Sequence, residues 1–376
     1  MKYHLEAPPG AARCRPPAPC PQRVSPGRGR CRKALIAILA AGLALLAMGC
    51  GRKANPGLRI GVVGLGSANS VGGADGEGIR VIEALRQASA GPSEIMVLSD
   101  PAFRTDLEAE TAACLERGAT VLAVCLGDPR KAASVIDKAK AGHVPVIFVG
   151  RKPSPDDMVR WDKLYYVGTR EGEDPTLQGE MAAAWWHSHP QADRNHDTKM
   201  QYVIFSGETG KDGELRDAEY CVKALGDAGI KGERLAEIPA GQGGEAESRA
   251  AARAAMAQIL GKSASRLEFV ICDTAASALG VLDALRASGY FRDGRTLPVV
   301  ARGTDRPILE AVRAGEFLGT VLDDDGRKGQ VVYELSEALV RGGEIDDLEW
   351  PISDNKYVWV PCRKVTAETA ASYMGR

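Results

Sequence analysis

Short apolar runs alternate with amphipathic stretches along nearly the whole chain from residue 58 onward. Strands that are separated by helices cannot pair as simple hairpins, so this order predicts α/β architecture with parallel sheets covered by helices on both faces. About 327 of the 376 residues follow position 49. That length exceeds one small core and favours two domains. The expected strands are 58–64, 94–99, 119–125, 144–150, 201–206, 267–272, 297–301 and 318–322, and the expected helices include 106–117, 130–141, 216–228, 245–260 and 306–314.

Residues 193–201 form a loop with oxygen-bearing groups at alternate positions, followed directly by the apolar run 202–205. Calcium prefers six to eight oxygen ligands, and the first nine positions of an EF-hand loop supply them from alternate residues. Thr198 replaces the usual Gly at position six and Ile204 the usual Glu at position twelve, so a closing carboxylate must come from elsewhere. We expect a calcium site, with a solvated acidic turn as the alternative. Its loop ligands would be Asp193, Asn195, Asp197, Lys199 through its carbonyl, and Gln201.

The chain from about 58 to 361, including this loop, resembles the bacterial galactose/glucose-binding proteins. These are type I periplasmic receptors of sugar ABC transporters. Segments 59–62, 144–149, 165–169 and 319–323 carry the resemblance. In that family a distant Glu completes the calcium loop, and the matching residue is Glu268. The resemblance therefore implies a structural Ca²⁺ ion.

The resemblance also implies a two-lobed fold, each lobe a parallel sheet with helices on both faces. Three crossovers would join the lobes near Thr169, Asp324 and Asn355. Ligand would lie between the lobes, at the carboxyl ends of the strands. The expected N-terminal lobe comprises 58–168 and 325–355, and the C-terminal lobe comprises 169–324 and 356–376.

Planar polar side chains near strand ends are the candidate solute ligands, because carboxylates, amides and guanidinium groups hydrogen-bond sugar hydroxyls in pairs. Asp212 and Arg216 match the family's Asp and Arg spacing, with an exposed ion pair at a helix start as the alternative. Asp323 stands in place of a family Asn, and Asn69 in place of an Asp. The candidates are Asn69, Arg151, Asp212, Arg216, Asp273, Thr274, Asp305 and Asp323.

Several departures weaken the hexose interpretation. The family stacks a Phe and a Trp on the two faces of the sugar, but Val71 and the Gly-rich segment 241–244 stand at those positions. Gly150, Leu65 and Gly303 replace three further polar or aromatic ligand positions, unless a neighbouring carboxylate substitutes for the last. A pocket that lacks these groups would bind glucose or galactose weakly, or would take another small polar solute.

The chain starts with features of a lipoprotein signal peptide. The apolar stretch 34–48 is too short for a typical membrane span, follows a basic segment and ends at Gly49-Cys50. We expect residues 1–49 to be a signal peptide, Cys50 to carry the lipid and 50–57 to be a linker. An ordinary signal peptide or a membrane anchor helix is the alternative.

Charge and motifs argue against other function classes. Residues 1–49 hold eight Lys/Arg and one acidic residue, so the net charge of −1 for the whole chain leaves −8 for the remainder, which disfavours nucleic acid as a partner. The loop 64–69 lacks the third Gly of a dinucleotide site, and no nucleophile elbow or phosphate-binding loop occurs. His187, His189 and His196 have no familiar metal-site spacing.

These features favour a lipid-anchored, periplasmic solute-binding protein with no enzymatic activity. It would close on a hexose and present the closed form to an ABC permease. Whether a chemoreceptor also reads the closed form stays open at this point. The alternative function is that of a sensor or interaction lipoprotein that has lost transport.

Overall fold

The computed structural model describes residues 57–65, 74–89, 93–97, 106–207, 217–239, 244–341, 345 and 350–374, without the side chains of 74–77. All of these residues belong to one compact unit, 54–376. No helix within these ranges combines the length and apolarity needed to cross a membrane. The expected signal peptide and the lipid-anchor residue Cys50 lie outside the described residues.

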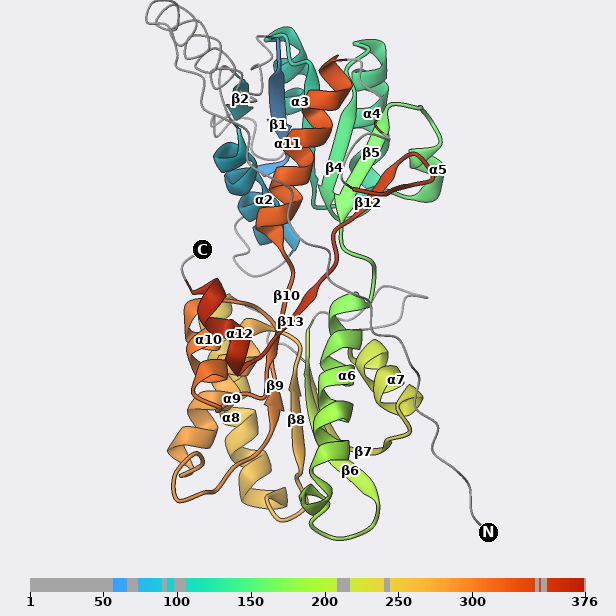
Figure 1. Ribbon diagram of the computed structural model, residues 1–376. Helices are drawn as coiled ribbons and strands as arrows, with labels where there is room; N and C mark the ends of the chain where they lie inside the picture. The colour runs from blue at the N-terminus through green and yellow to red at the C-terminus, as the bar shows by residue number, and fades with distance from the viewer. Residues whose placement is uncertain are drawn as a thin grey trace, which may run out of the picture. The chain divides into compact units, whose positions relative to one another are not determined.

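Seven of the described strands form a first sheet in the order β11-β12-β5-β4-β3-β1-β2 (Figure 1). Neighbouring strands are parallel, apart from the antiparallel pair β11 and β12. The central strands are buried on both faces, which explains their uninterrupted apolar sequences. The bounds are β1 Arg59–Val63, β2 Glu94–Val97, β3 Val121–Leu126, β4 Val146–Gly150, β5 Leu164–Gly168, β11 Ile352–Ser353 and β12 Tyr357–Trp359.

Helices cover both faces of the first sheet, because successive strand residues point to opposite sides. One core contains Ile60 and Val62 of β1 together with Leu85 of α2 and Leu335 of α11, and the opposite core contains Val63 of the same strand. Helices α3 and α4 cover the second of these faces. The helices are α2 Ala74–Ala88, α3 Leu107–Glu116, η3 Pro129–Lys131, α4 Ala132–Ala141, α5 Pro155–Met158 and α11 Asp325–Arg341.

Four described strands form a second, wholly parallel sheet in the order β7-β6-β8-β9. Helices α6 and α7 pack on one face, and α8, α9 and α10 pack on the other (Figure 1). The strands are β6 Lys199–Ser206, β7 Lys231–Pro239, β8 Phe269–Cys272 and β9 Val299–Val300. The helices are α6 Glu173–Ser188, η4 Pro190–Ala192, α7 Asp217–Asp227, α8 Glu245–Ser263, α9 Ala275–Ala287 and α10 Arg306–Arg313.

The chain passes between the two sheets three times: after β5, after β10 and after β12. Strand β10 (Thr320–Leu322) pairs antiparallel with β13 (Arg363–Val365), and Gly319 bridges to Val300 of β9. The chain then ends with α12 (Ala367–Ala370) and η6 (Ala371–Tyr373).

The predicted α/β class with helices on both faces of parallel sheets is confirmed. Strands β5, β7, β11, β12 and β13 were not among the expected strands. Among the described strands β7 pairs only with β6, and it is half-exposed, so its sequence is mixed rather than apolar. The expected lobe boundary at 355/356 falls too early, because β12 continues the first sheet by pairing with β5.

Candidate functional site

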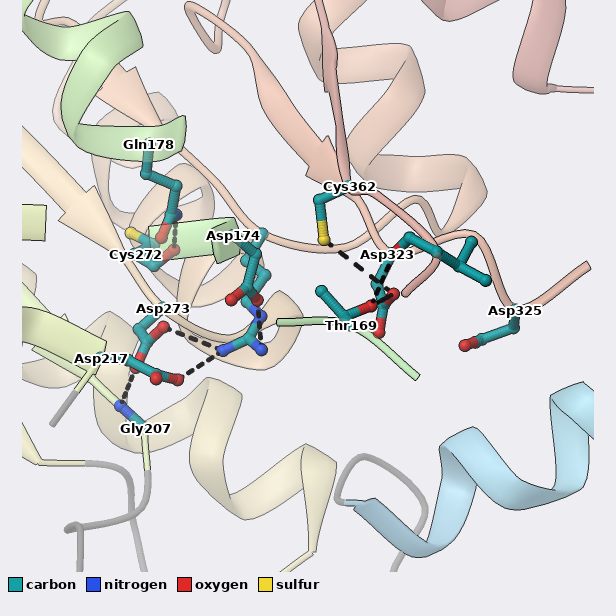
Figure 2. A network of polar contacts seen from close by, with 12 residues as sticks. Thr169, Asp174, Gln178, Gly207, Asp217, Cys272, Asp273, Asp323, Asp325 and Cys362 are labelled. Carbon is teal, nitrogen blue, oxygen red and sulfur yellow. Dashed lines mark hydrogen bonds and ion pairs between the residues drawn. The ribbon is translucent and has the colours of Figure 1, made fainter. Parts of the chain in front are cut away.

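Four charged side chains meet at the carboxyl edge of the second sheet. Asp273 directly follows β8, and Arg302 lies two residues beyond β9. Asp174 and Asp217 belong to the first turns of α6 and α7, whose N-termini lie at the same edge. Figure 2 shows the three carboxylates converging. We call these four residues the Arg302 cluster.

The Arg302 guanidinium binds all three carboxylates of the cluster. Its Nη1 donates to Asp217 Oδ2 at 2.7 Å and to Asp273 Oδ1 at 3.1 Å, and its Nη2 forms an ion pair with Asp174 Oδ2. The other oxygen of Asp273 accepts a 2.9 Å hydrogen bond from the Gly207 backbone, just after β6. The cluster therefore ties together the ends of three neighbouring strands.

Exposure divides the cluster into an inner and an outer part. The side chains of Asp174 and Asp273 are 9% and 5% exposed, whereas those of Arg302 and Asp217 are 35% and 38% exposed. Behind the inner part, Gln178 of α6 donates to the Cys272 carbonyl at 2.8 Å, and its buried Oε1 has no partner among the described residues. The outer pair can meet a molecule from solution.

Burial controls the protonation of the inner carboxylates. It raises the pKa of Asp174 to about 7, although Arg302 acts in the opposite direction and the charges of Asp217 and Asp273 add to the rise. Burial also raises the pKa of Asp273, again against the effect of Arg302. One guanidinium thus does not fully offset the cost of three neighbouring carboxylates.

A second group of polar contacts, which we call the Asp323 network, lies where the chain passes between the sheets. Thr169 Oγ1 donates to Asp323 Oδ1 at 2.6 Å and lies 3.3 Å from the Val360 carbonyl, so one hydroxyl touches all three passages. Lys328 Nζ is fully buried and contacts Asp323 Oδ2 at 2.6 Å and Asp325 Oδ1 at 3.4 Å.

The charge of Lys328 sets the state of Asp323. Burial alone would raise the pKa of Asp323, but the ammonium group and the hydrogen bonds from Lys328 and Thr169 bring it below its ordinary value. Asp323 was expected to bind solute. In the structure both of its oxygens are engaged by protein groups, as Figure 2 shows for the bond to Thr169.

Three other predicted ligands also lie near strand ends. Arg151 follows β4 and is half-buried. The Thr274 hydroxyl accepts from the Ser277 backbone at 3.1 Å and caps α9. Asp305 is exposed, and its Oδ2 lies 4.0 Å from the point that a Cβ on Gly303 would occupy. Its carboxylate thus reaches toward the position where the family has an Asp. The remaining candidates, Asn69, Asp212 and Arg216, lie outside the described residues.

Sequence reasoning missed three of the four cluster members. Arg302 follows the expected strand 297–301 directly, so the search of strand ends that found Asp273 could have found it. The next residue, Gly303, is the one that matches a family ligand position. Asp174 and Asp217 carried no such signal, because only the fold brings two helix N-termini to this edge.

The predicted calcium loop precedes and enters β6. The Asp193 carboxylate accepts hydrogen bonds from the backbone of Asp197 at 3.2 Å and of Thr198 at 2.9 Å. Thr198 has a φ of 65°, the left-handed conformation that favours glycine and for which an EF-hand loop uses Gly at this position. The loop therefore curls back on its first residue without the glycine.

The distant Glu268 lies against this loop. Its two oxygens accept from the backbone of Arg194 at 2.7 Å and of Gln201 at 3.0 Å. Gln201 is fully buried, and its Oε1 has no hydrogen-bond partner in the described part of the chain. Its amide nitrogen donates to Asp197 at 2.7 Å. An unpaired buried oxygen beside two carboxylates is the donor chemistry that a hard cation uses.

The same loop shows how a cation would have to be held. Among the described residues, no three His, Cys, Asp or Glu side chains form a metal-binding group. Amide and backbone carbonyl oxygens would therefore supply much of the coordination, as they do in many calcium sites. The side chains of Asn195 and Gln201 and the carbonyl of Lys199 are of this kind.

Comparison with known proteins gives two sequence matches. Residues 106–344 match the family model described as a periplasmic binding protein domain. The D-galactose/methyl-galactoside binding periplasmic protein MglB of Haemophilus influenzae is 30% identical over 262 residues, which cover 69% of this chain and 76% of that protein.

Solved structures match over most of the chain. An ABC transporter solute binding protein from Bacillus halodurans with bound myo-inositol gives a TM-score of 0.60 at 18% identity, covering 85% of this chain and 98% of that one. A periplasmic solute binding protein from Actinobacillus succinogenes with bound D-allose gives 0.61 at 14% identity, covering 84% and 100%. At such identities these matches show the fold.

Proposed function

The chain belongs to the periplasmic binding protein family, and on that premise we propose that it is the solute-binding protein of a sugar ABC transporter. Members of this family are periplasmic binding proteins rather than enzymes. The observation that carries the proposal is the Arg302 cluster, a partly exposed set of hydrogen-bonding groups at the carboxyl edge of the second sheet. Open α/β sheets bind their ligands at this edge.

The proposed solute is a hexose, glucose or galactose. The curated relative is named for D-galactose, and the structural neighbours carry D-allose and myo-inositol. Carboxylates and a guanidinium side by side suit a molecule covered with hydroxyl groups, because each hydroxyl can donate to one group and accept from the other. Another small polar solute is the second candidate, favoured by Val71 and the segment 241–244 in place of stacking aromatics.

The proposed mechanism is binding with hinge closure. A solute that contacts both lobes favours the closed arrangement by its differential affinity for the two states. The Asp323 network joins the three chain passages through Thr169, so it would guide the motion rather than hold the solute. An ABC permease would read the closed form. A chemoreceptor is a further proposed partner.

Calcium would be held by Asp193, Asn195, Asp197, the carbonyl of Lys199, Gln201 and Glu268. When bound, the ion would supply charge neutralisation and coordination that hold the loop against β8. Without an ion, the Asp193 carboxylate already accepts a hydrogen bond from within the loop. Glu268 accepts hydrogen bonds from the backbone near both ends of the loop, at Arg194 and Gln201. The proposed role is stability, remote from the solute.

The amino-terminal proposals are a cleaved lipoprotein signal peptide and a lipid on Cys50. The basic segment, the apolar stretch 34–48 and the small residue before Cys50 support them. Metabolic labelling with a radioactive fatty acid tests the anchor: label should enter the unaltered chain and not the Cys50→Ala variant.

Calorimetric titration with glucose and galactose tests the function, after carried-over solute has been removed by partial unfolding and refolding. Binding at micromolar or lower concentration supports a hexose receptor. A folded protein that binds neither sugar, but binds another polyol, moves the function to that solute. One that binds no small solute supports the sensor or interaction role.

A further inference from the structure

We propose that Arg302 and Asp217 touch the solute directly and together bind neighbouring hydroxyl groups, so that the second sheet selects neutral polyols over acidic sugars. The inference rests on the proposed function and deepens it. Neither residue was among the predicted ligands, and neither occupies a position at which the resemblance placed a ligand.

The Arg302 guanidinium has hydrogen-bonding capacity left. It carries five N–H groups. Nη1 donates to Asp217 and Asp273, and Nη2 forms an ion pair with Asp174. Within the described part of the chain, Nε and the second Nη2 hydrogen donate to no other group. The Arg302 side chain as a whole is 35% exposed at the sheet edge.

Asp217 supplies the complementary acceptor. Its Oδ2 receives Nη1 of Arg302 at 2.7 Å, while Oδ1 accepts from no group in the described residues. The side chain is 38% exposed. Donor and acceptor therefore lie side by side on the outer face of the cluster, within reach of two neighbouring hydroxyls.

The inner carboxylates act as positioning residues. Asp273 is fixed by the Gly207 backbone at 2.9 Å and holds Arg302 at 3.1 Å, and Asp174 binds the second guanidinium nitrogen. Both are nearly buried, so they hold the guanidinium in a single orientation. A donor that is fixed before binding loses less conformational entropy when the solute arrives.

Charge then determines which solutes fit. Even when Asp174 is protonated, Asp217 and Asp273 as carboxylates give the cluster two negative groups against one positive group. An acidic sugar would therefore meet net repulsion although a guanidinium is present. A solute cation would face the guanidinium itself. A neutral vicinal diol satisfies both sides, because one hydroxyl accepts from Arg302 while the other donates to Asp217.

Calorimetry on the full-length chain in mild detergent tests this assignment with two variants. Asp217→Asn changes a partly exposed group and keeps its shape, and Arg302→Lys keeps the charge but loses the fork. Arg302→Met would leave three carboxylates without a cation and risks unfolding. The matched controls are Asp283→Asn and Arg249→Gln, from an Arg–Asp pair at 2.8 Å between α8 and α9.

We expect each site variant to weaken binding of D-galactose, or of the neutral sugar that binds best, by about 10- to 100-fold, the effect of one hydrogen bond to a charged group. The control variants should bind like the unaltered protein. A series of monodeoxy sugars gives the decisive readout: the Asp217→Asn penalty should vanish for the analogue that lacks the contacted hydroxyl. D-Galacturonate should bind at least about 10-fold more weakly than D-galactose.

Failures of the two proposals can be told apart. If the unaltered protein binds a neutral sugar but folded variants bind it equally well, the contact assignment is wrong and the proposed function stands. A penalty that is the same for every deoxy analogue also overturns the contact and leaves only a structural role. If no neutral polyol binds to the unaltered protein, the proposed function fails and the assignment falls with it.

Discussion

The Arg302 cluster and the Asp323 network place similar chemical groups in opposite situations. Lys328 is fully buried, and although the Asp323 side chain is 33% exposed, both of its oxygens are occupied by Lys328 and Thr169. Arg302 is about one-third exposed and keeps two hydrogens unused within the described residues. Groups that the protein itself satisfies contribute to the architecture, whereas groups left partly unsatisfied at a sheet edge are available to a solute. The two regions should therefore respond differently to mutation.

Removing the cation of the Asp323 network should have the largest effect on stability. Lys328→Met leaves Asp323 and Asp325 without their buried partner, and breaking a buried pair in this way costs about 3–5 kcal/mol. Urea denaturation of the variant should show that loss. Lys223→Met, which removes an exposed i,i+4 pair with Asp227, should change the free energy of unfolding by less than about 0.5 kcal/mol. If the two variants lowered the free energy of unfolding equally, the buried Lys328 pair would contribute no more than an exposed ion pair. The Asp323 network would then have no special role in stability.

The predicted calcium loop extends the comparison, because the buried Gln201 Oε1 has no partner among the described residues. A ligand that binds only the folded state at 100 times its Kd adds about 2.7 kcal/mol. Adding calcium should therefore raise the melting temperature of the unaltered protein, and a chelator should reverse the rise. Asp193→Ala and Glu268→Ala should lower the melting temperature and abolish its calcium dependence.

Glu233→Gln serves as the control for the calcium prediction, since Glu233 is outside the proposed ligand set although its carboxylate lies 3.5 Å from the Gln201 amide nitrogen. It should keep the calcium response. If the unaltered protein melted at the same temperature with calcium and with chelator, the predicted calcium site would be wrong.

The sequence predicted the sheets better than the sites, for a physical reason. Buried parallel strands need apolar side chains on both faces, so β3 and β4 can be recognised in the sequence as continuous apolar segments. Strand β7 lies at an edge and carries polar residues such as Glu233 and Arg234, so it resembles a loop. Asp273 was found because it directly follows a strand.

The partners of Asp273 were not predictable in the same way. Asp174 and Asp217 lie 99 and 56 residues earlier in the chain, and only the packing of α6 and α7 on the sheet brings them to Arg302. Lys328 follows Asp323 by five residues, but its complete burial depends on the packing of α11 against α2. The local sequence gives the type of each side chain. It does not give the burial of that side chain, which decides whether the residue stabilises the fold or is available to a solute.

Acid titration should separate the inner from the outer part of the Arg302 cluster. Asp174 has a pKa raised to about 7, so the folded protein binds its proton more readily than the unfolded chain does. Its contribution to the free energy of unfolding is therefore present at low pH and is lost as the pH rises from about 4 to about 7. Asp174→Asn removes this contribution, which changes by about 2–3 kcal/mol between pH 5 and 8.

Melting temperatures at pH 5, 6, 7 and 8 measure the effect. The decline toward pH 8 should be shallower in Asp174→Asn than in the unaltered protein. Equal slopes would mean that Asp174 titrates alike in the folded and unfolded states, and the inner part of the cluster would then be less constrained by burial than its contacts indicate.

The smallest expected stability change is at Asp217, where the effect on binding is expected to be large. More than a third of this side chain is exposed, and ion pairs in such positions typically contribute no more than about 1 kcal/mol. Asp217→Asn retains an oxygen that can still accept from Arg302, so the free energy of unfolding should change by less than about 0.5 kcal/mol. Urea denaturation without solute measures this change. A loss of unfolding free energy close to that of Lys328→Met would mean that Asp217 is needed for folding stability. Asp217 would then resemble the residues of the Asp323 network, and its assignment as a solute ligand would lose its support.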